Sequence, residues 1–175
     1  RAGSSRLASR STGGTGDAWG ELIVMTPGPR RQVRSIVGAG AGVTVIDGNQ
    51  PRRVLNVDTG RTANISGVTI RDGYPLTAGG GGGIYNNDEL TLDNVHVDNN
   101  VIHATSSGEY NYGGGVYNDD TLHMSRGSTN GNMILATGAI DGIRAEGGGL
   151  YNASLANLHA TDLIGNQIHR TPPNA

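Results

Sequence analysis

The side chains best suited to chemistry in this sequence are a histidine and an aspartate two residues apart, His96 and Asp98. In a strand, residues i and i+2 point to the same face, so the imidazole and the carboxylate would lie side by side. Aligning the neighbouring repeats places Arg71 beside them on one side, and Ser128 and Asn130 on the other. A base that works near pH 7 and an arginine that neutralises a uronate are what a polysaccharide lyase or hydrolase needs. His96, Asp98 and Arg71 are therefore candidate catalytic residues, with Ser128 and Asn130 as candidate binding residues.

A non-catalytic explanation also fits the same face. A lone exposed histidine on a strand is most often simply solvated. The paired carboxylates of a glycosidase must lie about 5–9.5 Å apart, and no column of residues here demands that arrangement. We therefore expect a protein without catalytic residues and keep the enzyme as the alternative.

Two acidic residues could bind a cation. Asp88 and Asp120 occupy the same position in successive repeats. Carboxylates stacked about 4.8 Å apart repel each other, and Ca²⁺ would relieve the repulsion. The same side chains could instead splay into water in an exposed turn. We expect no obligatory cofactor and leave Ca²⁺ open.

All these positions are organised by a repeated hexapeptide. Gly-Gly-Gly-Ile-Tyr-Asn at 81–86 returns at 113–118 with Val116 and at 147–152 with Leu150, spaced by 32 and then 34 residues. Between the copies, short runs alternate in hydrophobicity and end in Gly, Asn or Asp, without a helical period. Repeats of this length are typical of stacked supersecondary units. The pattern predicts an all-β fold, a right-handed parallel β-helix of about four to five coils.

Stacked coils would place like residues in columns. Aromatic rings in a column can stack, and amides in a column can hydrogen-bond along the rod. The columns are Tyr85, Tyr117 and Tyr151; Asn86, Asn118 and Asn152; and Asn100, Asn132 and Asn166. A row of tyrosines is also a surface that can bind a sugar, so the three tyrosines are candidate binding residues as well. We expect the structural role to dominate.

The breaks between strands predict corners and loops. Gly67 and Asn94 share one slot where the alternation breaks, and both residue types enter the left-handed conformation cheaply. Arg126 and Ala160 follow in that slot and suit it less well, which predicts that the later corners differ. Residues 102–112 and 133–146 vary between repeats, so we expect them to be loops on one side of the rod.

Composition divides the chain into two parts. Residues 1–34 carry six Arg and two acids, about +4, whereas 35–175 carry seven Arg and thirteen acids, about −6. We expect 1–34 to be a basic flexible arm that ends in a capping strand, and 35–175 to be the β-helix. Nucleic-acid binding is not expected, because only the arm is basic and its one aromatic residue is Trp19. No apolar run reaches the roughly 18 residues of a membrane span.

The repeat units resemble a known group of proteins. Ile65-Ser-Gly-Val-Thr-Ile-Arg-Asp-Gly73, the hexapeptide at 81–86 and Leu90-Thr-Leu-Asp-Asn-Val-His-Val-Asp-Asn-Asn100 resemble units of the right-handed parallel β-helix repeat proteins of bacterial surfaces. The pattern also looks like the Gly-Gly-x-Ile and Asn-ending repeats of polymorphic outer-membrane proteins. The resemblance covers about residues 36–168, with Gly127 and Thr161 departing from it where a large apolar residue is typical. It implies a secreted or cell-surface location in a group that includes adhesins, secreted repeat proteins and carbohydrate-active enzymes.

Residues and resemblance together favour a secreted or cell-surface structural or adhesive protein. Such a rod would form a homo-oligomer, or a filament if its ends pair head to tail. The alternative is a carbohydrate-active enzyme, a lyase or hydrolase, that acts on an acidic polysaccharide from the His96 and Asp98 face. Polysaccharide is thus the one partner expected beyond the protein itself.

Overall fold

The computed structural model describes residues 22–24, 32–49, 51–76, 79–105, 109–137 and 143–170. Within these ranges all regular structure is β-strand, and the chain winds as a parallel β-solenoid of about four turns. The predicted parallel β-helix is therefore correct as a fold class. The sense of the winding stays a prediction. Most of the predicted arm lies outside the described residues: of 1–34, the structure describes Leu22–Val24 from the capping strand and 32–34, which begin the strand Gln32–Val37.

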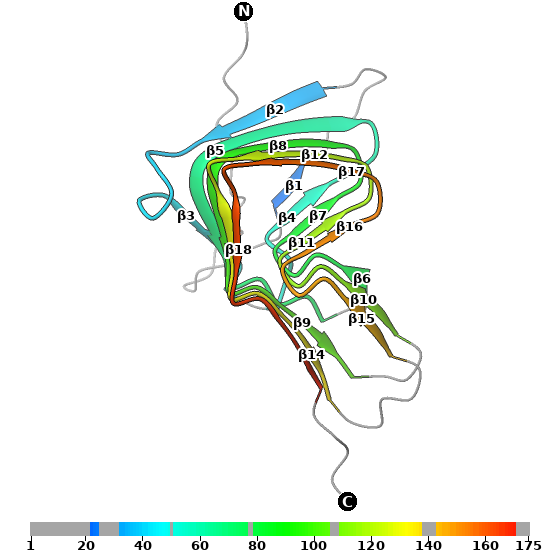
Figure 1. Cartoon of the computed structure of the whole chain (residues 1–175). Coiled ribbons are helices and arrows are strands. Elements are labelled where there is room, and N and C mark those ends of the chain that lie inside the picture. The colour runs from blue at the N-terminus through cyan, green and yellow to red at the C-terminus, as the bar shows by residue number, and fades with distance from the viewer. Residues whose placement is uncertain are drawn as a thin grey trace, which may run out of the picture.

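Successive coils repeat one order of strands (Figure 1). In the described residues the full order is present in the third and fourth coils and only part of it in the others. The first coil comprises β1 (Leu22–Val24), β2 (Gln32–Val37) and β3 (Val45–Asp47), and the second β4 (Leu55–Val57), β5 (Arg61–Arg71) and β6 (Gly79–Gly80). The third comprises β7 (Ile84–Asn86), β8 (Glu89–Asp98), β9 (Val101–Ala104) and β10 (Tyr110–Tyr112). The fourth comprises β11 (Val116–Asn118), β12 (Thr121–Ser125), β13 (Ser128–Asn130), β14 (Met133–Ala136) and β15 (Arg144–Glu146). The last coil comprises β16 (Leu150–Asn152), β17 (Leu155–His159), β18 (Asp162–Ile164) and β19 (Gln167–Arg170).

Strands of successive coils pair in parallel and in register. The hexapeptides align as predicted, with Tyr85, Tyr117 and Tyr151 directly opposite one another in β7, β11 and β16. The long β5 and β8 each cross a corner, and later coils divide the same stretch into two strands, β12 with β13 and β17 with β18. Two large sheets thus surround the body, and two three-stranded sheets leave it together (Figure 1).

These two small sheets form a projection that we call the fin: β6, β10 and β15 on one side and β9, β14 and β19 on the other. The prediction that 102–112 and 133–146 are loops is therefore wrong for the strands within them. Ile102, Ala104, Ile134 and Ala136 alternate with outward residues and are buried, and Ile143 completes a small core with the two alanines. The insertions form strands because this alternation gives each coil an apolar side to bury.

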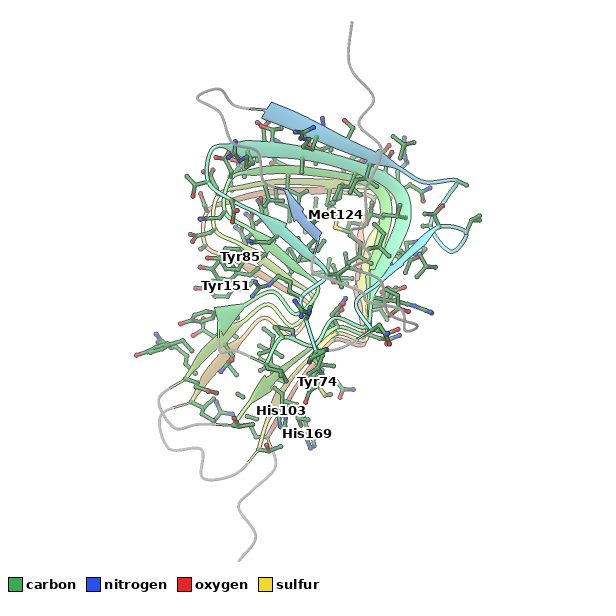
Figure 2. All side chains as sticks on the ribbon, turned by 180° about the vertical axis from the view of Figure 1, so that it is seen from behind. Tyr74, Tyr85, His103, Met124, Tyr151 and His169 are labelled. Atoms are coloured by element: carbon green, nitrogen blue, oxygen red, sulfur yellow. The ribbon has the colours of Figure 1, made fainter. Side chains whose placement is uncertain are left out.

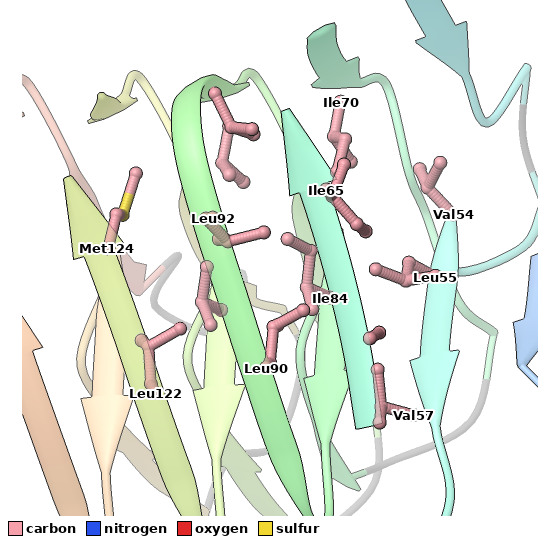
Figure 3. Close-up of a cluster of buried hydrophobic side chains, with 14 of the residues drawn as sticks. Val54, Leu55, Val57, Ile65, Ile70, Ile84, Leu90, Leu92, Leu122 and Met124 are labelled. Atoms are coloured by element: carbon pink, nitrogen blue, oxygen red, sulfur yellow. The ribbon is translucent and has the colours of Figure 1, made fainter. Parts of the chain in front are cut away.

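The main core lies inside the body and is built from columns of aliphatic residues (Figure 3). Ile65 of β5 lies opposite Leu92 of β8, which lies opposite Met124 of β12, and all three side chains are 2% exposed or less. Side chains between them in sequence point outward, as the period of two requires. Fully burying one such side chain contributes about 1.5–3 kcal/mol, so each added coil stabilises the rod.

One residue per coil turns the chain at the corner between the long sheet segments. Gly67, Asn94, Arg126 and Ala160 occupy this slot with φ of 62°, 52°, 53° and 47°. The prediction that the later corners differ is wrong, because stacking holds all four residues in the same left-handed conformation. For Arg126 and Ala160 this conformation costs roughly 1–2 kcal/mol each, which the ladders on either side must offset.

Each hexapeptide requires its three glycines for three separate reasons. Gly113 has φ of 64° and turns the chain into β11. A Cβ on Gly114 would lie 2.2 Å from the carbonyl oxygen of Gly148 in the next coil, and one on Gly115 would lie 2.8 Å from the Asn132 amide group. The triplet therefore lets the backbone turn, lets neighbouring coils approach and makes room for a buried asparagine.

Candidate functional site

The first asparagine column lies inside the rod. Nδ2 of Asn86 donates to Oδ1 of Asn118 over 2.6 Å, and Asn118 donates to Asn152 over the same distance. Each Nδ2 also donates to backbone oxygens, for example from Asn118 to Asp120 and Leu155. Asn86 and Asn118 are fully buried. Because the amides satisfy one another and the adjoining turn, this column stabilises the solenoid and offers no donor to a ligand.

The second asparagine column comprises Asn100, Asn132 and Asn166, which directly precede the fin strands β9, β14 and β19. Asn100 donates to Asn132, and Asn132 donates to Asn166, each over 3.0 Å. Gly73 holds the equivalent position in the second coil, and its backbone N–H donates to Oδ1 of Asn100 over 2.9 Å. The predicted amide ladders are therefore present, and both are structural.

The tyrosine column is a stack of rings. Tyr85 and Tyr117 have ring centroids 4.9 Å apart at an interplanar angle of 18°, and Tyr117 and Tyr151 lie 5.5 Å apart at 6°. Figure 2 shows Tyr85 and Tyr151 on the outside of the rod, above the fin. Because the rings stack on one another, they turn their edges to solvent. A sugar that stacks on an aromatic face would find these faces already occupied.

Both ends of the stack have neighbours. The guanidinium carbon of Arg53 lies 5.0 Å from the centre of the Tyr85 ring, and the same side chain donates to the carbonyl oxygens of Gly80 and Gly81. Tyr112 of the fin lies 4.5 Å from Tyr151 at 30°. The residue pattern does not mark Tyr112, because its column holds Gly80 and Glu146 in the adjacent coils. The tyrosines therefore brace the fin against the body.

Two phenols of this stack, those of Tyr85 and Tyr117, have raised pKa values. Burial, and then the nearby Asp119 carboxylate, raise the pKa of Tyr85, with Arg53 acting the other way. Burial also raises the pKa of Tyr117, whose hydroxyl donates to Asp119 Oδ1 over 3.0 Å. Both hydroxyls stay protonated near neutral pH, so they can serve as hydrogen-bond donors but not as bases.

The His96 and Asp98 face has the predicted register. Thr69, His96, Ser128 and Asp162 form one row across β5, β8, β13 and β18, and Arg71, Asp98, Asn130 and Ile164 form the next. The charges are arranged differently from the enzyme hypothesis. Nη2 of Arg71 lies 3.0 Å from Asp47 Oδ2, and its Nε lies 3.2 Å from Asp72 Oδ2. The Arg71 guanidinium is thus already neutralised by two carboxylates of its own and the preceding coil.

Asp98 is the unusual residue of this face. Burial raises the pKa of Asp98, while His96 and hydrogen bonds with Asn130 act in the opposite direction. Its Oδ1 is buried without a hydrogen-bond partner, and so is Oδ1 of Asn130 in the next coil. Nδ2 of Asn130 donates to Ser128 Oγ over 2.9 Å. Two neighbouring acceptors without donors suit a hydroxyl or a cation.

Asp88 and Asp120 do not converge on one point. Asp88 Oδ2 accepts from the backbone N–H of Gly60 over 2.5 Å, and Asp120 Oδ1 accepts from the hydroxyl of Thr121 over 2.9 Å. Across the described ranges, His, Asp and Glu side chains form no group of three or more that could hold a metal ion. Calcium at these aspartates therefore stays a prediction without support from the geometry.

The fin also carries a hydrogen-bonded histidine, His103, that the residue pattern does not mark. Nδ1 of His103 lies 2.6 Å from the Tyr74 hydroxyl, and Nε2 lies 2.7 Å from Thr137 Oγ1 (Figure 2). The three residues belong to successive coils, so no spacing in the sequence marks them as neighbours. Both partners are hydroxyls that can donate or accept, so either tautomer of the imidazole satisfies this chain of hydrogen bonds.

The two ends of the rod carry most of its exposed apolar surface. Of the exposed large hydrophobic side chains in the described residues, all but Leu76 and Tyr110 lie in the first or the last coil. On the last coil the core columns simply run out: Leu158 is 41% exposed whereas Met124, one coil earlier in its column, is 2% exposed. Leu163 and Ile168 show the same change, at 48% and 43%.

No helix in the described part of the chain is long and apolar enough to cross a membrane. Comparisons with protein-family models, with curated proteins and with solved structures find no match to this chain.

Proposed function

We propose that the protein is a structural or adhesive β-helix, secreted or displayed on a cell surface, that self-associates through the ends of its rod. One observation carries the proposal: core columns that are closed within the rod are half open at its last coil, as Leu158, Leu163 and Ile168 demonstrate. Monomeric proteins rarely leave such apolar patches uncovered, and unpaired parallel edges add backbone donors and acceptors to them.

The internal architecture supports a structural role. The asparagine and tyrosine columns use side chains that could otherwise bind ligands to hold coils together instead. The repeat units resemble those of polymorphic outer-membrane proteins and other bacterial surface β-helices, which favours a location outside the cell. A rigid rod with exposed apolar side chains at its ends and a projecting fin suits assembly or adhesion better than catalysis.

The test is self-association of the purified chain in a dilution series, followed by light scattering after gel filtration and by negative-stain microscopy. Leu158→Asp with Leu163→Asp places carboxylates on the open columns and should raise the dissociation constant by about 100-fold or more. Leu76→Asp is the matched control, because Leu76 is exposed but lies away from both end coils. Unmodified protein that stays monomeric at every concentration would refute the proposal.

A second candidate is supported by the unpaired oxygens of Asp98 and Asn130. We propose as the alternative that this face binds or cleaves an acidic polysaccharide, with His96 as base. Incubation with a panel of uronate polysaccharides should then release reducing or unsaturated products. His96→Ala and Asp98→Asn should each lower the rate at least about 100-fold, whereas His123→Ala, in β12 on the other side of the corner in the same sheet, should not. Equal rates in all three variants would exclude this face.

A further inference from the structure

We propose that the rods join head to tail and in register, so that the last coil of one copy is continued by the first coil of the next. This inference rests on the proposed function and specifies its interface. It places β17 of one copy beside β2 of the other, β18 beside β3, and β16 beside β1. The parallel ladders would then run through the junction as they run through each copy.

Strand direction permits this junction without rearrangement. β2 and β17 belong to the same column of strands, because β2 pairs with β5, β5 with β8, β8 with β12 and β12 with β17, all in parallel. The outer edge of β17 therefore has the donors and acceptors that the outer edge of β2 complements. The same holds for β18 and β3 through β13, β8 and β5.

The side chains that meet are compatible in polarity. Following the columns, Ile36 of one copy would lie on Leu158 of the other, and Ile46 would lie on Leu163. Ile36 and Ile46 are half-buried against the core of their own copy, which leaves their outer sides uncovered. Joining the two faces would return these columns to the aliphatic packing that they have inside the rod.

Size is matched at Arg34, the charged residue among the described inward columns that meet at the interface, whereas Asp47 and Asp162 lie in outward columns. Arg34 occupies an inward column on β2, opposite Ala63, and that column holds Leu90 and Leu122 before ending in Ala156 on the last coil. In the junction, Arg34 would lie between Ala63 of its own copy and Ala156 of the neighbouring copy. Two small residues around one long side chain leave room for its aliphatic stem, while the guanidinium reaches toward the polar edge.

Like-to-like pairing explains less. Two last coils facing each other would leave Val37, Val43 and Val45 of the first coil uncovered, with exposed fractions of 80%, 72% and 42%. The burial of apolar side chains at both ends therefore favours the pairing of unlike ends.

The absence of cysteine allows a direct test by disulfide trapping. Ser35 and Asn157 are exposed and share one outward column, through Asn64, Thr91 and His123. In the proposed junction their Cα atoms would lie about 4.8 Å apart, within disulfide range. Ser35→Cys protein mixed with Asn157→Cys protein under mild oxidation should give a mixed covalent dimer, at least about 10-fold above either variant alone.

A register control uses Val37→Cys with Asn157→Cys. Val37 lies two residues further along β2, about 8 Å from Asn157 in the junction, too far for a disulfide. Efficient cross-linking of that pair, or of Asn157→Cys alone, would overturn the head-to-tail register but leave end-to-end association standing. Monomeric behaviour of the unmodified chain at every concentration would overturn both.

Discussion

Asn132 accepts two hydrogen bonds from Asn100 through one oxygen: the backbone N and the side-chain Nδ2 of Asn100 both lie 3.0 Å from Asn132 Oδ1. Asn132 also donates to the carbonyl oxygen of Val97 over 2.7 Å and to Asn166 Oδ1 over 3.0 Å. Its side chain is fully buried. One residue thus connects three successive coils.

Replacing Asn132 with Ala should lower the free energy of unfolding by about 2–4 kcal/mol, because the change leaves buried donors and acceptors unpaired. Urea unfolding followed by circular dichroism measures the difference. Asn157→Ala is the control, since Asn157 is an exposed asparagine and should change stability by no more than about 0.5 kcal/mol. Equal losses in both variants would contradict the structural role of the column.

Substitution of Gly115 tests a steric requirement that is separate from backbone conformation. A Cβ there would lie 2.7 Å from the carbonyl oxygen of Gly149 and 2.8 Å from the Asn132 amide, so Gly115→Asn should unfold the later coils. At Gly60 the φ is 79° and nothing lies within 4 Å of a Cβ. Gly60→Asn should therefore fold with nearly unchanged thermal stability, because asparagine tolerates this conformation. A reversed order of the two melting temperatures would refute the steric explanation.

The corner at Ala160 should be improvable. Ala160 has φ of 47°, and removing its Cβ relieves a cost of roughly 1–2 kcal/mol, partly offset by the greater freedom of glycine when unfolded. Ala160→Gly should stabilise the protein by about 0.5–1 kcal/mol in thermal or urea unfolding. Ala153→Gly is matched, exposed and outside the left-handed slot. That control should be neutral or destabilising, and an equal gain in both would exclude relief of strain.

Asp98 predicts a pH dependence with a definite sign. Burial raises the pKa of Asp98 in the folded chain above its ordinary value of 3.8, so folding favours the protonated form. The contribution of Asp98 to stability is complete below pH 3.8 and is lost as the pH rises through the raised pKa. Asp98→Asn should therefore be more stable than the unmodified protein at pH 7, with a smaller difference at pH 3. Urea titrations at both pH values decide, and a difference that grows toward pH 3 would contradict the sign.

Tyr117 predicts a late phenol titration. Burial and the bond to Asp119 raise the pKa of Tyr117, so its phenolate should form well after that of an ordinary tyrosine. Ultraviolet difference titration should lose its last component in Tyr117→Phe, whereas the control Tyr110→Phe, at an exposed position, should leave that last component unchanged. Folding must be monitored in parallel, and a missing early component in Tyr117→Phe would show that the hydroxyl is solvated.

The sequence predicted the parts of this fold that depend on repetition. The hexapeptide established the coil, and identical residues at equal spacing, such as Asn100 and Asn132, established the columns. The fin was not predicted, because its strands are short and their apolar residues, such as Ala104 and Ala136, are small. The left-handed Arg126 was unexpected because local preference opposes it, and stacking on Asn94 overrides that preference.

The candidate site was predictable only in part. Register put His96, Asp98 and Arg71 on one face, but the pairing of Arg71 with Asp47 depends on the direction of a long side chain. The contact between Tyr74 and His103 likewise joins two residues that do not share a column. Such contacts depend on rotamers and on how far coils are offset, and neither quantity is encoded in residue spacing.

Residues 113–137 and 143–146 are the described part of one coil, and its two faces meet the neighbouring coils in the same register. A second copy of this segment, inserted after Glu146, would keep every column and lengthen the rod by about 4.8 Å. The distance between the ends is then a countable quantity, changed in whole steps by duplication, while the surfaces at the ends stay the same. Reach and recognition can vary independently in such a chain.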